Sequence, residues 1–135
     1  MNPEPHFRQL LAAAAAQPEP QRLLFVFAVA ELPANATPEQ RERFEAGRGG
    51  ALEPLMCVDK APEELPDFPA LVSEAERAGP PWSVVFAASL SGQAGRPADK
   101  ARIDLALETM VQAVRDGRID GFAAYGPRGE FLEFG

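Results

Sequence analysis

The only cysteine of the chain, Cys57, lies two residues before the charged pair Asp59 and Lys60. A cysteine becomes a nucleophile when a nearby base or cation lowers its thiol pKa. The single histidine, His6, precedes the first predicted helix, and Lys60 should point to the opposite face of a strand over 54–58. Because the flanking residues are apolar, we predict that Cys57 is buried as a small hydrophobic residue, with a reactive thiol as the alternative.

A second candidate site is the segment SLSGQAGRPADK, residues 89–100, between an apolar run and the longest predicted helix. Its glycines, Gly92 and Gly95, could turn backbone N–H groups toward an anion, and Arg96 adds a positive charge. The segment matches neither the P-loop pattern nor a dinucleotide fingerprint, and Asp99 would repel an anion. We therefore predict a connecting loop, with an anion site as the alternative.

Polar residues also follow the predicted strands. If the first three strands are parallel, their carboxyl ends meet at one rim, where open sheets of this kind bind ligands. This rim would collect Glu31, Asp59, Lys60, Ser91 and Arg96. Such a set could hold a small anionic metabolite or a phosphate ester, and the alternative is a group of solvated loop residues.

Composition limits the possible functions. The 135 residues fit one domain, and 13 Lys and Arg against 20 Asp and Glu give a net charge of −7. This charge disfavours a nucleic-acid partner. One cysteine and one histidine cannot form an internal disulfide or a structural zinc site. We therefore predict no catalytic constellation, no metal site and no cofactor.

The chain shows no signal for a membrane. Its longest apolar run, Leu23 to Ala30, is far shorter than the roughly 20 residues that span a bilayer. The first 20 residues hold acids and prolines where a signal peptide needs a basic start. We expect a cytoplasmic protein that does not contact membranes.

Hydrophobic spacing predicts the elements that must position these residues. Uninterrupted apolar strands are typical of the centre of a sheet that is covered on both faces. Thr37 begins a capping box, and Gly47 suits a helix end. The predicted helices are 4–16, 37–47, 67–79 and 98–116, and the predicted strands are 22–32, 54–58, 82–90, 119–125 and 130–134.

This order predicts an α/β fold with a single domain over 1–135. Strands that alternate with helices favour a mainly parallel sheet, here of about five strands with helices packed on its faces. The last two strands, joined by GPRG, should form a C-terminal antiparallel hairpin at the sheet edge.

The segments QPEPQRLLFVFAVAELP, GGALEPLMCVDK and GPPWSVVFAASLSG resemble a small bacterial family whose members often carry the label "ribonucleotide reductase subunit alpha". The resemblance covers nearly the whole chain and rests on structural motifs. The catalytic subunit of that reductase uses a thiyl radical and a separate pair of reducing cysteines. Cys57 alone cannot supply both, so we do not expect that reaction here.

The sequence favours a protein that acts by association, as a homo-oligomer or an accessory subunit. It has no catalytic motif, its net charge is acidic, and Phe131, Leu132 and Phe134 lie on a terminal strand that could be exposed. The alternative function is binding of a small anionic ligand at the rim.

Overall fold

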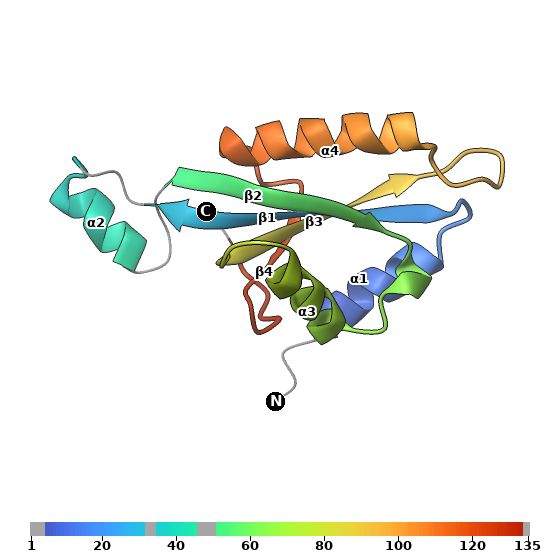
Figure 1. The fold of residues 1–135 in the computed structure, drawn as a ribbon, viewed down its shortest axis with the longest axis horizontal. Coiled ribbons are helices and arrows are strands. Elements are labelled where there is room, and N and C mark those ends of the chain that lie inside the picture. The colour runs from blue at the N-terminus through green and yellow to red at the C-terminus, as the bar shows by residue number, and fades with distance from the viewer. Residues whose placement is uncertain (1–4, 32–34, 46–50, 134–135) are drawn as a thin grey trace.

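The computed structural model describes residues 5–31, 35–45 and 51–133, which form one antiparallel sheet with helices on both faces (Figure 1). Four strands make up the sheet, in the order β2-β1-β3-β4. The elements are α1 (Pro5–Ala15), β1 (Gln21–Glu31), α2 (Pro38–Glu45), β2 (Ala51–Lys60), the 3-10 helix η1 (Pro62–Glu64), α3 (Phe68–Ala78), β3 (Val84–Ser91), α4 (Lys100–Arg115) and β4 (Ala123–Tyr125).

The predicted class, a mixed α/β fold, is confirmed, but the mainly parallel sheet of five strands is wrong. β1 pairs antiparallel with both β2 and β3, so that Leu23 lies opposite Lys60 on one side and Ser89 on the other. β2 and β3 do run in the same direction, yet β1 separates them. The prediction failed because α2 does not cross the sheet between parallel strands, but lies beyond the ends of β1 and β2 (Figure 1).

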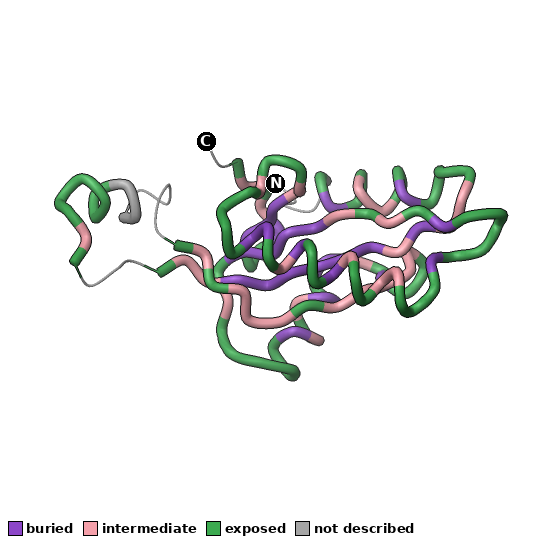
Figure 2. Tube along the Cα trace, turned by 90° about the horizontal axis from the view of Figure 1, so that it is seen from above, coloured by how far each residue is buried: buried purple, intermediate pink, exposed green. Residues whose placement is uncertain are grey.

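β1 is the central strand that its continuous apolar sequence predicts. Alternate side chains from Leu23 to Phe27 join the core under α1 and α3. The intervening side chains, from Leu24 to Ala28, join a second core under α4. Together the two cores bury β1 from Leu23 to Ala28 and β3 from Val84 to Ala87 (Figure 2). Each large apolar side chain buried in this way contributes about 1.5–3 kcal/mol.

Phe7 ties α1 to three other elements. Its ring is fully buried, 5.1 Å from the ring of Phe68 on α3 and 5.5 Å from that of Tyr125 on β4. Phe25 of β1 lies 6.2 Å away. The edge-to-face pairs with Phe68 and Tyr125 each add about 0.5–1.5 kcal/mol beyond the area that they bury. Burial also raises the pKa of Tyr125 to about 12.

The two edge strands of the sheet, β4 and β2, differ in length and regularity. The predicted C-terminal hairpin is reduced to the three residues of β4 and one bridge between Tyr125 and Phe131. Phe131 is 41% exposed and Leu132 half-buried, while Phe134 lies outside the described residues. On the opposite edge, β2 carries Pro54 and a register shift, both of which discourage pairing with a further strand.

Side-chain caps fix the starts of α2 and α4, and the capping box at Thr37 is the one that the sequence predicts. The Gln40 N–H donates to Thr37 Oγ1 over 3.1 Å, and the Gln40 side chain accepts from the Thr37 N–H over 2.8 Å. Asp99 accepts from the Arg102 N–H at the start of α4. Gly47, the predicted end of α2, lies outside the described residues.

The connection from β3 to α4, residues 92–99, contains a two-residue turn. Gln93 and Arg96 exchange backbone hydrogen bonds of 2.9 and 3.0 Å across the central residues Ala94 and Gly95. Both central residues have positive φ, 54° and 78°, as in a type I′ turn. Ala94 is therefore strained, because a left-handed conformation brings its Cβ close to backbone oxygen.

We expect Ala94→Asn to raise the free energy of unfolding by about 0.5–1 kcal/mol, because asparagine tolerates the left-handed region and Asn-Gly is the preferred sequence of this turn. Ala94→Val, which places a branched Cβ there, should lower it. Urea denaturation with an unchanged m-value measures both differences. An asparagine variant less stable than the wild type would contradict the turn assignment.

Candidate functional site

The structure divides the predicted rim between two ends of the sheet. Asp59 lies opposite Leu24, whereas Glu31 lies opposite Ala51 at the far end of β1. Glu31 lies seven positions after Leu24 along extended β1, which corresponds to roughly 23 Å. Antiparallel pairing is the reason, because it sends the carboxyl ends of β1 and β2 in opposite directions. Glu31 therefore shares no site with the other four residues.

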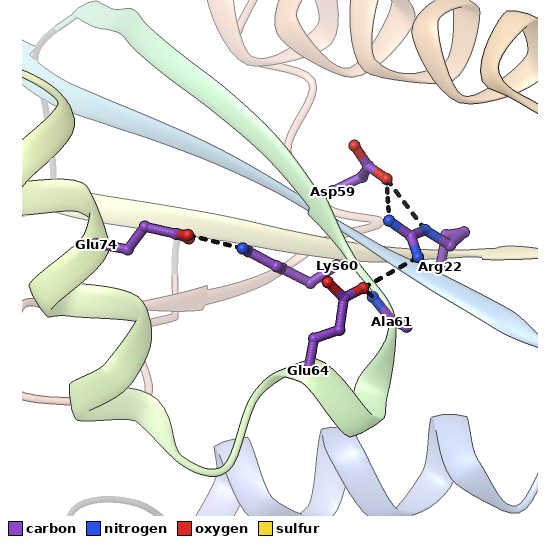
Figure 3. Close-up of polar contacts among 6 residues, drawn as sticks. All are labelled: Arg22, Asp59, Lys60, Ala61, Glu64 and Glu74. Atoms are coloured by element: carbon purple, nitrogen blue, oxygen red, sulfur yellow. Dashed lines mark hydrogen bonds and ion pairs between the residues drawn. The ribbon is translucent and has the colours of Figure 1, made fainter.

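The side chains of Asp59 and Lys60, which are adjacent in sequence, point to opposite faces of β2 (Figure 3). Lys60 Nζ forms an ion pair of 2.7 Å with Glu74 Oε1 of α3. Asp59 lies on the α4 face, where its Oδ2 accepts from Arg22 Nε over 3.0 Å. Each side chain is thus bound to a partner within the chain, and the two do not converge on one ligand.

Arg22 is the cation that the sequence interpretation missed. Besides Asp59, it donates from Nη1 to Glu64 Oε1 over 3.1 Å, so one guanidinium holds β2 and η1 together (Figure 3). The Ala61 N–H donates to the same Glu64 oxygen over 2.8 Å. This backbone hydrogen bond first, and then the charge of Arg22, lower the pKa of Glu64. The sequence signal for this role was an arginine at the start of an otherwise apolar strand, where it must find a partner or reach solvent.

Ser91 belongs to a polar network at the start of β1. The buried Gln21 donates to Ser91 Oγ over 2.8 Å, and Ser89 Oγ donates to Gln21 Oε1 over 2.6 Å. Gln21 also donates to the Glu19 carbonyl. The network satisfies a buried amide, which is costly to leave without partners. Ser91 is therefore explained by packing.

The glycine-containing segment 89–100 is already filled by carboxylates of the chain itself. The Gly95 N–H donates to both Glu19 oxygens, over 3.0 and 3.2 Å. Asp99 caps the N-terminus of α4. The Gly95 N–H and the first N–H groups of α4 are the donors that a bound anion would use, and carboxylates of the chain already accept from them. Arg96 is held in the turn described above and is exposed.

Cys57 is exposed, so the prediction of a buried thiol is wrong. The expected alternation is confirmed, since Cys57 and Asp59 lie on one face, opposite Val26 and Leu24. The thiol is accessible because β2 is an edge strand. Partial burial, and then the carboxylates of Asp59 and Asp104, raise the pKa of Cys57. A raised pKa disfavours the thiolate form, which is the form that acts as a nucleophile.

A groove of about 430 Å³ lies between α4 and β3. Of the concave surfaces described for residues 5–31, 35–45 and 51–133, it has the most apolar lining. It exists because α4 packs mainly over β2 and β1, leaving the outer part of β3 less covered (Figure 1). Leu105 of α4 borders it and is 64% exposed. The lining residues are Leu24, Ala88, Ser89, Leu90, Arg102, Leu105, Ala106, Thr109, Met110, Ala113 and Phe122.

Comparison with known proteins gives no match to any family model, curated protein or solved structure. The resemblance noted in the sequence therefore gains no support from them. In the described part of the chain, no helix is long and apolar enough to cross a membrane. Residues 5–31, 35–45 and 51–133 also contain no cluster of three His, Cys, Asp or Glu residues that could bind a metal ion.

We expect Glu64→Gln to lower the free energy of unfolding at neutral pH by less than about 1 kcal/mol, because Glu64 is exposed and its ion pair is screened. The folded pKa of Glu64 lies below the unfolded value of about 4.3. Its stabilising contribution is thus complete above that pH and is lost as the pH falls through the folded pKa. Urea titrations at several pH values measure this trend.

The neighbouring exposed Glu63 supplies the control for that experiment. Glu63→Gln removes the same charge from η1 without removing the bonds to Arg22 and Ala61. A pH-dependent loss of equal size in both variants would show that net charge, and not the Arg22 cluster, is responsible.

We expect the Cys57 thiol to be alkylated more slowly at neutral pH than a cysteine in an unstructured peptide, because its raised pKa leaves less thiolate. Asp104→Asn should accelerate the reaction, whereas Glu76→Gln on α3 should leave it unchanged. Iodoacetamide alkylation rates measured against pH by mass spectrometry give the apparent pKa. A value at or below about 8.5 would contradict this account.

Proposed function

We propose that this protein functions by binding a protein partner, either a second copy of itself or another protein, in the groove between α4 and β3. One observation carries the proposal. Leu105 is a large apolar side chain with 64% of its surface exposed, and it stands at the rim of an apolar groove. A contiguous exposed apolar surface costs solubility and is typical of interaction sites.

The surroundings of the groove support this choice. The small side chains Ala88, Ala106 and Ala113 leave space for side chains of a partner. Leu24 and Met110 form the buried floor. Groove-shaped sites with an apolar floor bind helices or extended peptides in many complexes.

Binding of a small anion, the alternative function, has weaker support. Its candidate residues are divided between two ends of the sheet, and the polar groups of Asp59, Lys60 and Ser91 have partners within the chain. The Gly95 N–H is likewise used by Glu19. An anion would have to displace these carboxylates, and no observation favours that exchange.

We expect Leu105→Glu to weaken association at least tenfold, because it removes a large apolar contact and puts a charge in its place that binding would have to desolvate. Its folding should change little, since the residue is exposed. Ala101→Glu adds the same charge on α4 at an exposed position that does not line the groove. Light scattering of the purified proteins, and quantitative mass spectrometry of proteins retained from native lysate, compare all three.

Loss of self-association or of an identified partner in Leu105→Glu alone would support the proposal, provided that the purified partner reproduces the difference. A monomeric wild type whose retained proteins are the same as those of Leu105→Glu would overturn it.

A further inference from the structure

The groove is bordered by a strand edge that is open. β4 pairs with β3 only at Val85, Phe86 and Ala87. Beyond them, no strand of the described residues pairs with Ala88–Ser91 on the side away from β1. The connection between α4 and β4 turns at Ile119 to Phe122, where the Phe122 N–H donates to the Ile119 carbonyl. A longer β4 would have filled this position.

Hydrogen bonds show which backbone groups face outward. The Gly92 N–H donates to the Pro20 carbonyl of the segment before β1, so even-numbered residues in this part of β3 direct their N–H and C=O groups toward β1. Odd-numbered residues direct theirs away. The Ser91 carbonyl fits this pattern, since it accepts from Arg102 Nη2 over 3.2 Å. The N–H and C=O of Ser89 therefore lie at the open edge.

The open edge and the groove are one surface. Ser89 lines the groove, although its hydroxyl lies on the opposite face of the sheet with Gln21. Its backbone is thus the part that faces the groove. Leu90 and Ala88, which lie on the α4 face opposite Arg22 and Leu24, form the adjoining apolar surface.

The charge at this surface differs from that of the whole chain. The net charge is −7, yet Arg102 is the one charged residue among those known to line the groove. Asp104 lies on the other side of α4, near Cys57 of β2, and Glu108 follows it one turn later. Arg102 uses one nitrogen for the Ser91 carbonyl and has further donors that suit a carboxylate.

We infer that the groove binds a short extended segment of another protein, which adds to the sheet as a strand beside Ala88–Ser91 and places a carboxylate at Arg102. This inference rests on the proposed protein-binding function and names its mode. The edge is four residues long, about 13 Å, so the segment is short. Apolar side chains at alternate positions would enter the groove, while the intervening ones would lie beside Ser89 and Ser91 and could be polar.

The test uses a phage-displayed library of random octapeptides, selected on the full chain and counter-selected on Leu105→Glu. We expect peptides with alternating apolar residues and an Asp or Glu at one end. In synthetic copies, N-methylation of the backbone nitrogen that pairs with Ser89 should lower affinity at least tenfold. N-methylation of the next residue, whose N–H points away from β3, should have a much smaller effect.

Arg102→Gln tests the carboxylate. It should weaken the acidic peptide at least fivefold and have little effect on the same peptide with Gln in place of its acid. Arg115→Gln, at the exposed end of the same helix, serves as the control and should leave both affinities unchanged.

The outcomes separate this inference from the proposed function. Peptides that require Leu105 but bind equally well at every N-methylated position would preserve the binding surface and overturn the strand. Failure to select any peptide that requires Leu105 would overturn the strand as well, while a native partner lost in Leu105→Glu would still support the function. A dimer in light scattering that becomes a monomer in Leu105→Glu would identify a second copy as the occupant and overturn the inference.

Discussion

The burial of β1 on both faces, together with its pairing on both edges, is the constraint on which the rest of the structure depends. Its side chains from Leu23 to Ala28 alternate between two apolar cores. α1 and α3 must cover one core, and α4 must cover the other. Because β2 and β3 both pair with β1, they run in the same direction on either side of it.

This arrangement also explains the groove. One helix, α4, covers the second face of a sheet with four strands, and it packs mainly over β2 and β1. The outer part of β3 is therefore less covered, and the short β4 leaves its edge open. The two edges of the sheet differ accordingly, since β2 is protected by Pro54 and a register shift.

The charged residues at the start of β1 and the end of β2 have partners within the chain, unlike the apolar groove. Arg22 binds Asp59 and Glu64, Lys60 binds Glu74, and Glu19 binds the turn at Gly95. These contacts hold β2, η1, α3 and the turn after β3 in place. They account for the residues that looked most suited to binding an anion.

Local patterns in the sequence predicted local structure well. The apolar run of β1 identified a central strand, and the capping box at Thr37 is formed as predicted. Strand direction could not be predicted, because an intervening helix such as α2 can lie in a connection between antiparallel neighbours. The predicted grouping of Glu31 with Asp59 failed for that reason. The burial of Cys57 was predicted wrongly because the apolar sequence of an edge strand such as β2 does not differ from that of a buried strand.

The groove was not predictable from the sequence, since it depends on how α4 sits over the sheet. Leu105 lies off the apolar stripe of its helix, so helical spacing indicates that it is exposed but not that it borders a groove. Arg102 likewise gains its significance only from the Ser91 carbonyl beside it.

Amide hydrogen exchange in the free protein, followed by NMR, tests the central claim most directly. The account predicts that the Ser89 N–H exchanges rapidly with solvent, while the N–H groups of Ala88 and Leu90, which face β1, are protected. Protection of Ser89 equal to that of its two neighbours would show that the edge of β3 is covered, and would contradict the account.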